Sequence, residues 1–202
     1  FFRNGLVSHL AGKGNENEYQ DIRESAIPLT SFKCSEEDVF CEYLKKDFFA
    51  HRGLDNLSMT VKGILRGHFE EVFVNVGLHA DTSYPIFTCG QYFPVKNILK
   101  FTLVDLGVGF LKKISLLTNG QTSKDNEAII WATEGRNSTK DKQFGPGGTG
   151  LKDLKKYCEE NNGSFHICSG ANYVSFVKDK TLSYPISEPL FGSMINLIFR
   201  QI

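Results

Sequence analysis

The sequence predicts a two-layer α+β domain, in which helices pack on a layer of β-sheet. Apolar residues recur at helical spacing in two long segments before residue 80, and strand-like runs elsewhere are paired across turn residues. Helices and strands therefore come in blocks rather than in strict alternation, which is typical of α+β domains. The chain has 202 residues, 41% hydrophobic and 23% charged, enough for one good-sized domain with a real core.

Four helices are expected. Ser35 is a plausible N-cap for the first, because acidic residues follow it and apolar residues then recur at helical spacing. The second begins near Ser58 and carries the most sustained apolar pattern. Residues 1–30 look irregular. The expected helices cover residues 35–50, 58–80, 126–134 and 151–160.

The expected strands form two groups. The first is a hairpin, since two apolar runs are joined by a turn around Pro94 and Asn97. The second group follows the last helix, which ends at Asn161-Asn162-Gly163. The expected strands cover residues 84–93, 98–104, 164–169, 173–178 and 194–200.

Composition excludes several classes of function. Acidic and basic side chains balance at 23 each, so no overall charge favours nucleic acid or an anionic membrane as partner. The five cysteines never form Cys-x-x-Cys, and no apolar run approaches the ~20 residues that span a bilayer. We therefore expect a cytoplasmic protein without a disulfide framework, a zinc site or a membrane span. The chain begins at Phe1, so an upstream segment stays open.

One polar stripe lies along the second expected helix. Glu71, Asn75 and His79 are spaced four residues apart, so they project from nearly one face, between apolar neighbours. Asn offers an oxygen ligand suited to Mg²⁺, and a Glu one turn earlier could orient or deprotonate a nucleophile. The alternative is an ordinary helix with satisfied surface polar groups.

Two glycine-rich segments follow. Asp105-x-Gly107-x-Gly109 ends a strand, where the carboxylate could accept from an adenine amine and the glycines allow close backbone approach. The alternative there is a plain turn. The second segment leads into a helix whose free N–H groups could bind phosphate, with Thr149 as cap or phosphate ligand. A flexible hinge is its alternative. The residues of this segment are Gly145, Gly147, Gly148, Thr149, Gly150 and Leu151.

The order and spacing of these motifs resemble the ATP-binding superfamily of gyrase, Hsp90, histidine kinases and MutL. Glu71, Asn75 and His79 resemble its N box, with the spacing of anti-sigma-factor serine kinases. The two glycine segments resemble its glycine boxes, and Gly192-Ser193 resembles the Gly-Thr before its closing strand. The likeness covers about residues 58–202, and leaves residues 1–57 as an N-terminal extension or the end of a truncated upstream domain.

This resemblance implies the Bergerat-type fold, a two-layer sandwich with a mixed, mainly antiparallel sheet covered on one face by helices. It also implies ATP and Mg²⁺ as cofactors, with Asn75 as the metal ligand. The lid over ATP would span about residues 110–148, and Arg136-Asn-Ser-Thr139 would lie nearest the γ-phosphate. Cations of the lid could meet phosphates or lie solvated on the surface. They are Lys112, Lys113, Lys124, Arg136, Lys140 and Lys142.

The expected function is Mg-ATP binding, in a stand-alone ATPase or an anti-sigma-like protein serine kinase of bacterial signalling, with Glu71 as catalytic base. One alternative is a non-catalytic, nucleotide-dependent protein-interaction module. Others are a fragment of an ATP-gated clamp protein and an unrelated α+β domain with accidental glycines. Besides the adenine nucleotide we expect a protein partner, with a homodimer left open. Within the 202 residues we expect neither the histidine-kinase phosphoacceptor helix nor the second domain of the clamp proteins, unless that domain was cut away.

Overall fold

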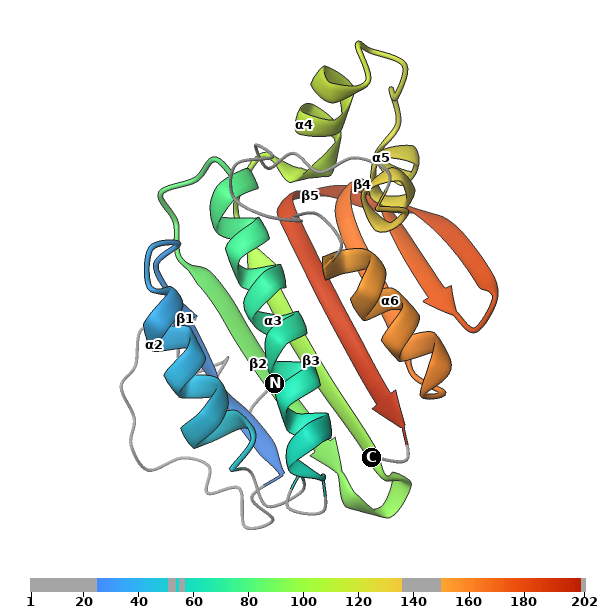
Figure 1. Cartoon of the computed structure of the whole chain (residues 1–202). Coiled ribbons are helices and arrows are strands. Elements are labelled where there is room, and N and C mark those ends of the chain that lie inside the picture. The colour runs from blue at the N-terminus through green and yellow to red at the C-terminus, as the bar shows by residue number, and fades with distance from the viewer. Residues whose placement is uncertain (1–24, 51–53, 55–56, 136–149, 201–202) are drawn as a thin grey trace.

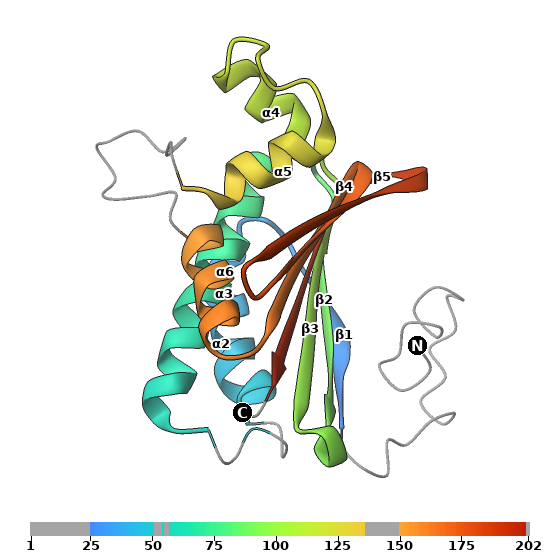
Figure 2. The ribbon, with the colours of Figure 1, turned by 90° about the vertical axis from the view of Figure 1, so that its right-hand side faces the viewer.

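The fold is an α+β two-layer sandwich, as the sequence predicts. The computed structural model describes residues 25–50, 54, 57–135 and 150–200. In this part of the chain, helices α2, α3 and α6 lie on one face of a single sheet, and α4 and α5 lie together at one end of it (Figures 1 and 2). The candidate site lies where these two helix groups meet.

The sheet has five described strands in the order β1-β2-β3-β5-β4, and all four pairings are antiparallel. A mixed, mainly antiparallel sheet was expected, and the described strands include no parallel pair. β5 lies between β3 and β4, so it connects the two halves of the sheet. The strands are β1 Ala26–Phe32, β2 Ile86–Phe93, β3 Ile98–Asp105, β4 Ser164–Val177 and β5 Lys180–Arg200.

The described helices include four that the sequence predicts, within a few residues at their ends, and one that it does not. The unpredicted helix is α4, which begins inside the expected lid. The helices are α2 Glu37–Tyr43, α3 Met59–His79, α4 Gly109–Leu117, α5 Asp125–Thr133 and α6 Gly150–Glu160. The chain continues from α2 into a π-helical turn, η1 Leu44–Phe48, and a 3₁₀ turn, η3 Pro94–Lys96, joins β2 to β3.

The N-terminal region corrects two sequence predictions. Residues 26–30 were expected to be irregular but belong to β1, which pairs with β2. Ser35 is not the cap of the first helix, because Glu36 occupies the N-cap position and no side chain caps the helix there. Phe32 of β1 packs edge-on against Phe73 of α3, and its ring centroid lies 5.3 Å from that of Phe40 of α2. All three side chains belong to the shared core. Residues 26–48 thus share one core and one sheet with the elements that follow them.

Aromatic side chains fill the space between α3 and the sheet. Phe69 stacks on Phe101 of β3 with ring centroids 4.8 Å apart, and Phe73 stacks on Phe40 at 4.3 Å. All four rings are at most 2% exposed. Burying such a side chain stabilises the fold by about 1.5–3 kcal/mol. This packing fixes α3 on the sheet and thereby fixes which side of the helix remains available to a ligand.

The C-terminal hairpin is longer than predicted. β4 extends beyond residue 169 and β5 begins well before residue 194, so the two strands form one twisted hairpin. The sequence predicted interrupted strands there. The two strands stay paired across register shifts between Ser169 and Asn172, which form a bulge. In Figure 1 the hairpin extends beyond the end of β3, next to α5.

Candidate functional site

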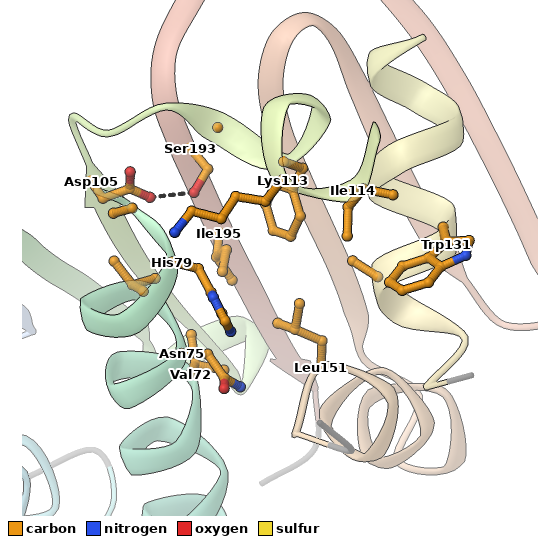
Figure 3. Close-up of a pocket in the computed structure, with 15 residues that line it drawn as sticks. Val72, Asn75, His79, Asp105, Lys113, Ile114, Trp131, Leu151, Ser193 and Ile195 are labelled. Carbon is orange, nitrogen blue, oxygen red and sulfur yellow. Dashed lines mark hydrogen bonds between the residues drawn. The ribbon is translucent and has the colours of Figure 1, made fainter. Parts of the chain in front are cut away.

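Helix α3 provides two polar side chains of the candidate site. Ser58 caps the helix, since its Oγ accepts a hydrogen bond from Val61 N at 3.2 Å, and Ala80 is the C-cap. The buried residues of the helix face the sheet. Asn75 and His79, one turn apart and partly buried, instead project toward the space under α4 and α5 (Figure 3).

Asp105 is the last residue of β3 and is only 2% exposed. Its Oδ1 accepts a hydrogen bond from Gly107 N at 2.8 Å, and its Oδ2 accepts one from the hydroxyl of Ser193, the residue paired with it on β5. Burial raises the pKa of the Asp105 carboxyl above its ordinary value, and the bonds from Ser193 and Gly107 oppose this rise. The result is a buried carboxylate held in one orientation.

The glycines next to Asp105 allow three backbone segments to meet. A Cβ on Gly107 would overlap the carbonyl of Ala80, and a Cβ on Gly192 would overlap the carbonyl of Asp105. Gly109 has φ +70° and would bring a Cβ to 2.6 Å from Ser169 Oγ. The positive φ and the close approach both require glycine. The junction joins the end of α3 to the start of α4 and to β5.

Two polar side chains attach α4 and α5 to the hairpin. Ser169 Oγ accepts from Phe110 N at 3.2 Å and donates to Gly192 O at 2.9 Å, which holds the first turn of α4 on β5. Asp125, in the first turn of α5, accepts from Ala171 N at 2.9 Å in the β4 bulge. These bonds position one wall of the site.

A cavity of about 120 Å³ lies between these elements. A single water needs only about 10–15 Å³, so the cavity can hold a larger group. Most of the wall is apolar, and a few polar side chains reach into it, as is usual for small-molecule sites. The lining residues are Val72, Asn75, Val76, His79, Ala80, Asp105, Gly109, Phe110, Lys113, Ile114, Trp131, Ala132, Leu151, Ser193 and Ile195.

Seven residues that the sequence singles out line this cavity together: Asn75, His79, Asp105, Gly109, Lys113, Leu151 and Ser193. In Figure 3, Asn75 and His79 come from α3, Leu151 rises from α6, and Asp105 is hydrogen-bonded to Ser193 at the opposite end. Gly107 and Gly150 are not among the lining residues. Gly145, Gly147, Gly148 and Thr149 lie outside the described residues, as do Arg136, Lys140 and Lys142.

Glu71 lies apart from the cavity lining. It is one turn before Asn75, and its carboxylate packs on Gly150, where a Cβ would lie 2.7 Å from Glu71 Oε1. Gly150 is the first residue of α6. The carboxylate is therefore next to the helix start for which the sequence predicts a phosphate site.

Apart from Lys113, the sequence did not single out the α4–α5 wall. Phe110, Ile114, Trp131 and Ala132 line the cavity because α4 and α5 pack together at the end of the sheet. Trp131 is the one tryptophan of the chain, which could have marked it, but nothing in its local pattern indicates a binding site. Their role follows from tertiary contacts alone.

No group of three or more His, Cys, Asp or Glu side chains that could hold a metal occurs among the described residues. No helix in the described part of the chain is long and apolar enough to cross a membrane. A scan against protein-family models and a search of curated proteins found no match. Membership of the superfamily named above thus stays a prediction from the motifs.

Proposed function

We propose that this chain is an Mg-ATP-binding domain of the histidine-kinase-like ATPase type. One observation carries the proposal: residues from motifs far apart in the sequence line one cavity. Asn75 comes from the first motif, Asp105 from the second and Leu151 from the third, with Ser193 beside Asp105. An accidental set of glycines and polar residues has no reason to converge in this way.

The adenine would lie at the Asp105 end. The carboxylate is buried and fixed by two hydrogen bonds, so its remaining lone pairs can accept from an exocyclic amine. Val76, Ile114 and Ile195 supply apolar surface for a planar ring in the same cavity. The phosphates would then extend toward Asn75 and the start of α6, where backbone N–H groups and the helix dipole favour anions.

The direct test is a nucleotide titration of the full chain with ATP, ADP, GTP and CTP, with and without Mg²⁺. Trp131 lines the cavity and is the only tryptophan, so its fluorescence reports on occupancy. We expect saturable changes with ATP and ADP and much weaker ones with GTP and CTP. If no nucleotide changes the fluorescence or the melting temperature, the proposed function is wrong.

Asn75 fits a Mg²⁺ role, because its side chain lines the cavity and Mg²⁺ commonly takes few protein ligands, with phosphates and waters completing the shell. Mg²⁺ would neutralise phosphate charge. We expect Asn75→Ala to abolish the magnesium-dependent tightening of ATP binding and to leave metal-free ADP binding little changed. Titrations with and without Mg²⁺ measure both. An equal loss in the two titrations would identify Asn75 as a structural polar residue instead.

Ser193 is expected to set the pH range of ATP binding. Only the ionised Asp105 carboxylate is a pure acceptor, so binding is lost as pH falls through its pKa, which burial already raises. Ser193→Ala removes a hydrogen bond that lowers this pKa, so the acidic limit of ATP binding should move to higher pH. The same substitution at Ser183, on the exposed part of β5, is the control. Coinciding pH profiles would contradict this role of Ser193.

Two activities are compatible with this site. An ATPase or anti-sigma-like serine kinase would use Glu71 as base toward water or a partner's serine. A nucleotide-dependent interaction module would need no base, and the position of Glu71 outside the cavity lining favours it. Both act on a protein partner in the cytoplasm, and the Glu71 experiment in the Discussion separates them.

A further inference from the structure

Lys113 of α4 is a cation that lines the cavity without a partner in the described part of the chain. Two other lysines of the expected lid each lie close to a carboxylate. Lys112 lies 3.8 Å from Asp81 Oδ2, and Lys124 lies 3.2 Å from Glu127 Oε1, both with exposed side chains. Lys113 is partly buried and forms no ion pair with a described residue, although it belongs to the cavity wall. An ammonium group in a mostly apolar wall would be stabilised by an acceptor on a ligand.

The Lys113 side chain points toward the base end of the cavity. In Figure 3 it extends from α4 toward the Asp105–Ser193 pair, and its amino group ends between Asp105 and His79 in that view. Asn75 and Leu151 lie at the other end of the drawn group. A role for Lys113 in phosphate binding, one of the two roles that the sequence left open for it, would require the opposite direction.

Asp105 and Lys113 thus offer an acceptor and a donor to the same ligand. They line one cavity, yet they form no ion pair within 4.0 Å. A ligand between them would need a hydrogen-bond donor facing Asp105 beside an acceptor facing Lys113. The edges of adenine meet this requirement, since the 6-amino group lies between two ring acceptors, N1 and N7.

We propose that Lys113 is a base-reading residue, whose ammonium donates a hydrogen bond to the ring nitrogen next to the adenine amine that Asp105 accepts. This inference rests on the proposed nucleotide function and adds a second determinant of base specificity. Guanine fits less well. Its N1 carries a hydrogen and its C6 carries an oxygen, so the edge beside Asp105 would offer an acceptor where adenine offers the amine, and a donor where Lys113 needs an acceptor.

The test pairs a protein variant with two altered bases. Lys113→Met keeps an unbranched apolar stem and removes the donor. 1-deaza-ATP and 7-deaza-ATP each replace one of the two ring acceptors with C–H. We expect Lys113→Met to weaken ATP binding about tenfold, the low end for a charged hydrogen bond, because the ammonium is partly exposed.

One of the two deaza analogues should bind the parent protein about tenfold more weakly than ATP does. The same analogue should bind Lys113→Met as tightly as ATP binds this variant. That non-additivity assigns the bond, and the analogue that loses affinity identifies the ring nitrogen. Lys112→Met, the adjacent exposed lysine, should bind all three nucleotides as the parent does. Melting temperatures of the two variants control for folding.

The outcomes are distinct. If the parent binds ATP and Lys113→Met binds it equally well, or if both deaza analogues bind the parent as ATP does, the Lys113 assignment is overturned and the proposed function stands. Tighter binding of GTP than of ATP overturns the adenine-reading arrangement in favour of guanine. If the parent binds no nucleotide, both proposals fail together.

Discussion

Asp105→Asn should weaken ATP binding by about 10-fold to 150-fold, the cost of one charge-assisted hydrogen bond of about 1.5–3 kcal/mol. Gly107 N donates to one carboxylate oxygen at 2.8 Å, so the asparagine must keep its oxygen there. Its amide nitrogen then replaces the oxygen that faces Ser193. A donor would meet the adenine amine, and the two groups would repel.

The measurement is a titration of Trp131 fluorescence with ATP, compared between the parent protein and Asp105→Asn. Asp81→Asn is the matched control, because Asp81 has an exposed side chain and lies outside the cavity lining. It should bind ATP as the parent does. Unchanged ATP affinity in Asp105→Asn would mean that the base does not lie at this end of the cavity.

Glu71→Gln is expected to reduce ATP turnover or phosphotransfer by about 10²-fold or more, while ATP affinity stays equal or becomes slightly tighter. The carboxylate lies against the first residue of α6, next to the expected phosphates, which repel it. Glutamine keeps the shape and removes both the charge and the basicity. Binding and catalysis should therefore respond in opposite directions.

Turnover of ATP by the parent and the variant is the measurement, with Glu70→Gln as control. Glu70 is the neighbouring residue on α3, and its Oε1 lies 3.3 Å from Arg66 Nε. Loss of its charge should leave turnover unchanged. Equal turnover in Glu71→Gln would exclude Glu71 as the base. If the parent binds ATP but shows no turnover with cellular partners added, the interaction module becomes the better description.

The predictions from the sequence were accurate where local signals and tertiary packing agree. α3 begins after Ser58 as expected, because a capping serine precedes a long apolar pattern. β1 was missed, since Pro28 interrupts a short run whose alternation is weak. α4 was missed because Gly107 precedes it, Gly109 is its first residue and its lysines are typical of a loop. In the structure, Ser169 and the positive φ of Gly109 start this helix.

The polar part of the candidate site could be predicted, and its apolar wall could not. Asn75, Asp105 and Ser193 belong to motifs with fixed spacing, so their sequence positions alone identify them. Trp131 lies on α5, which Asp125 attaches to the β4 bulge, more than 40 residues away in the chain. The direction of Lys113 likewise depends on how α4 packs. Such contacts produce no periodic pattern in the sequence from which they could be predicted.

The position of β5 has a consequence for how the protein folds. This strand follows all other described elements in the chain, yet it lies between β3 and β4 and contributes Ser193 and Ile195 to the cavity. During synthesis, α3, β3 and α6 emerge first and cannot enclose the cavity until this late strand inserts, a slow, long-range step. A ligand of the cavity binds only the completed sheet and, by mass action, favours it over partly folded chains. Ligand supply in the cell would then influence how much of the newly made protein reaches the folded state.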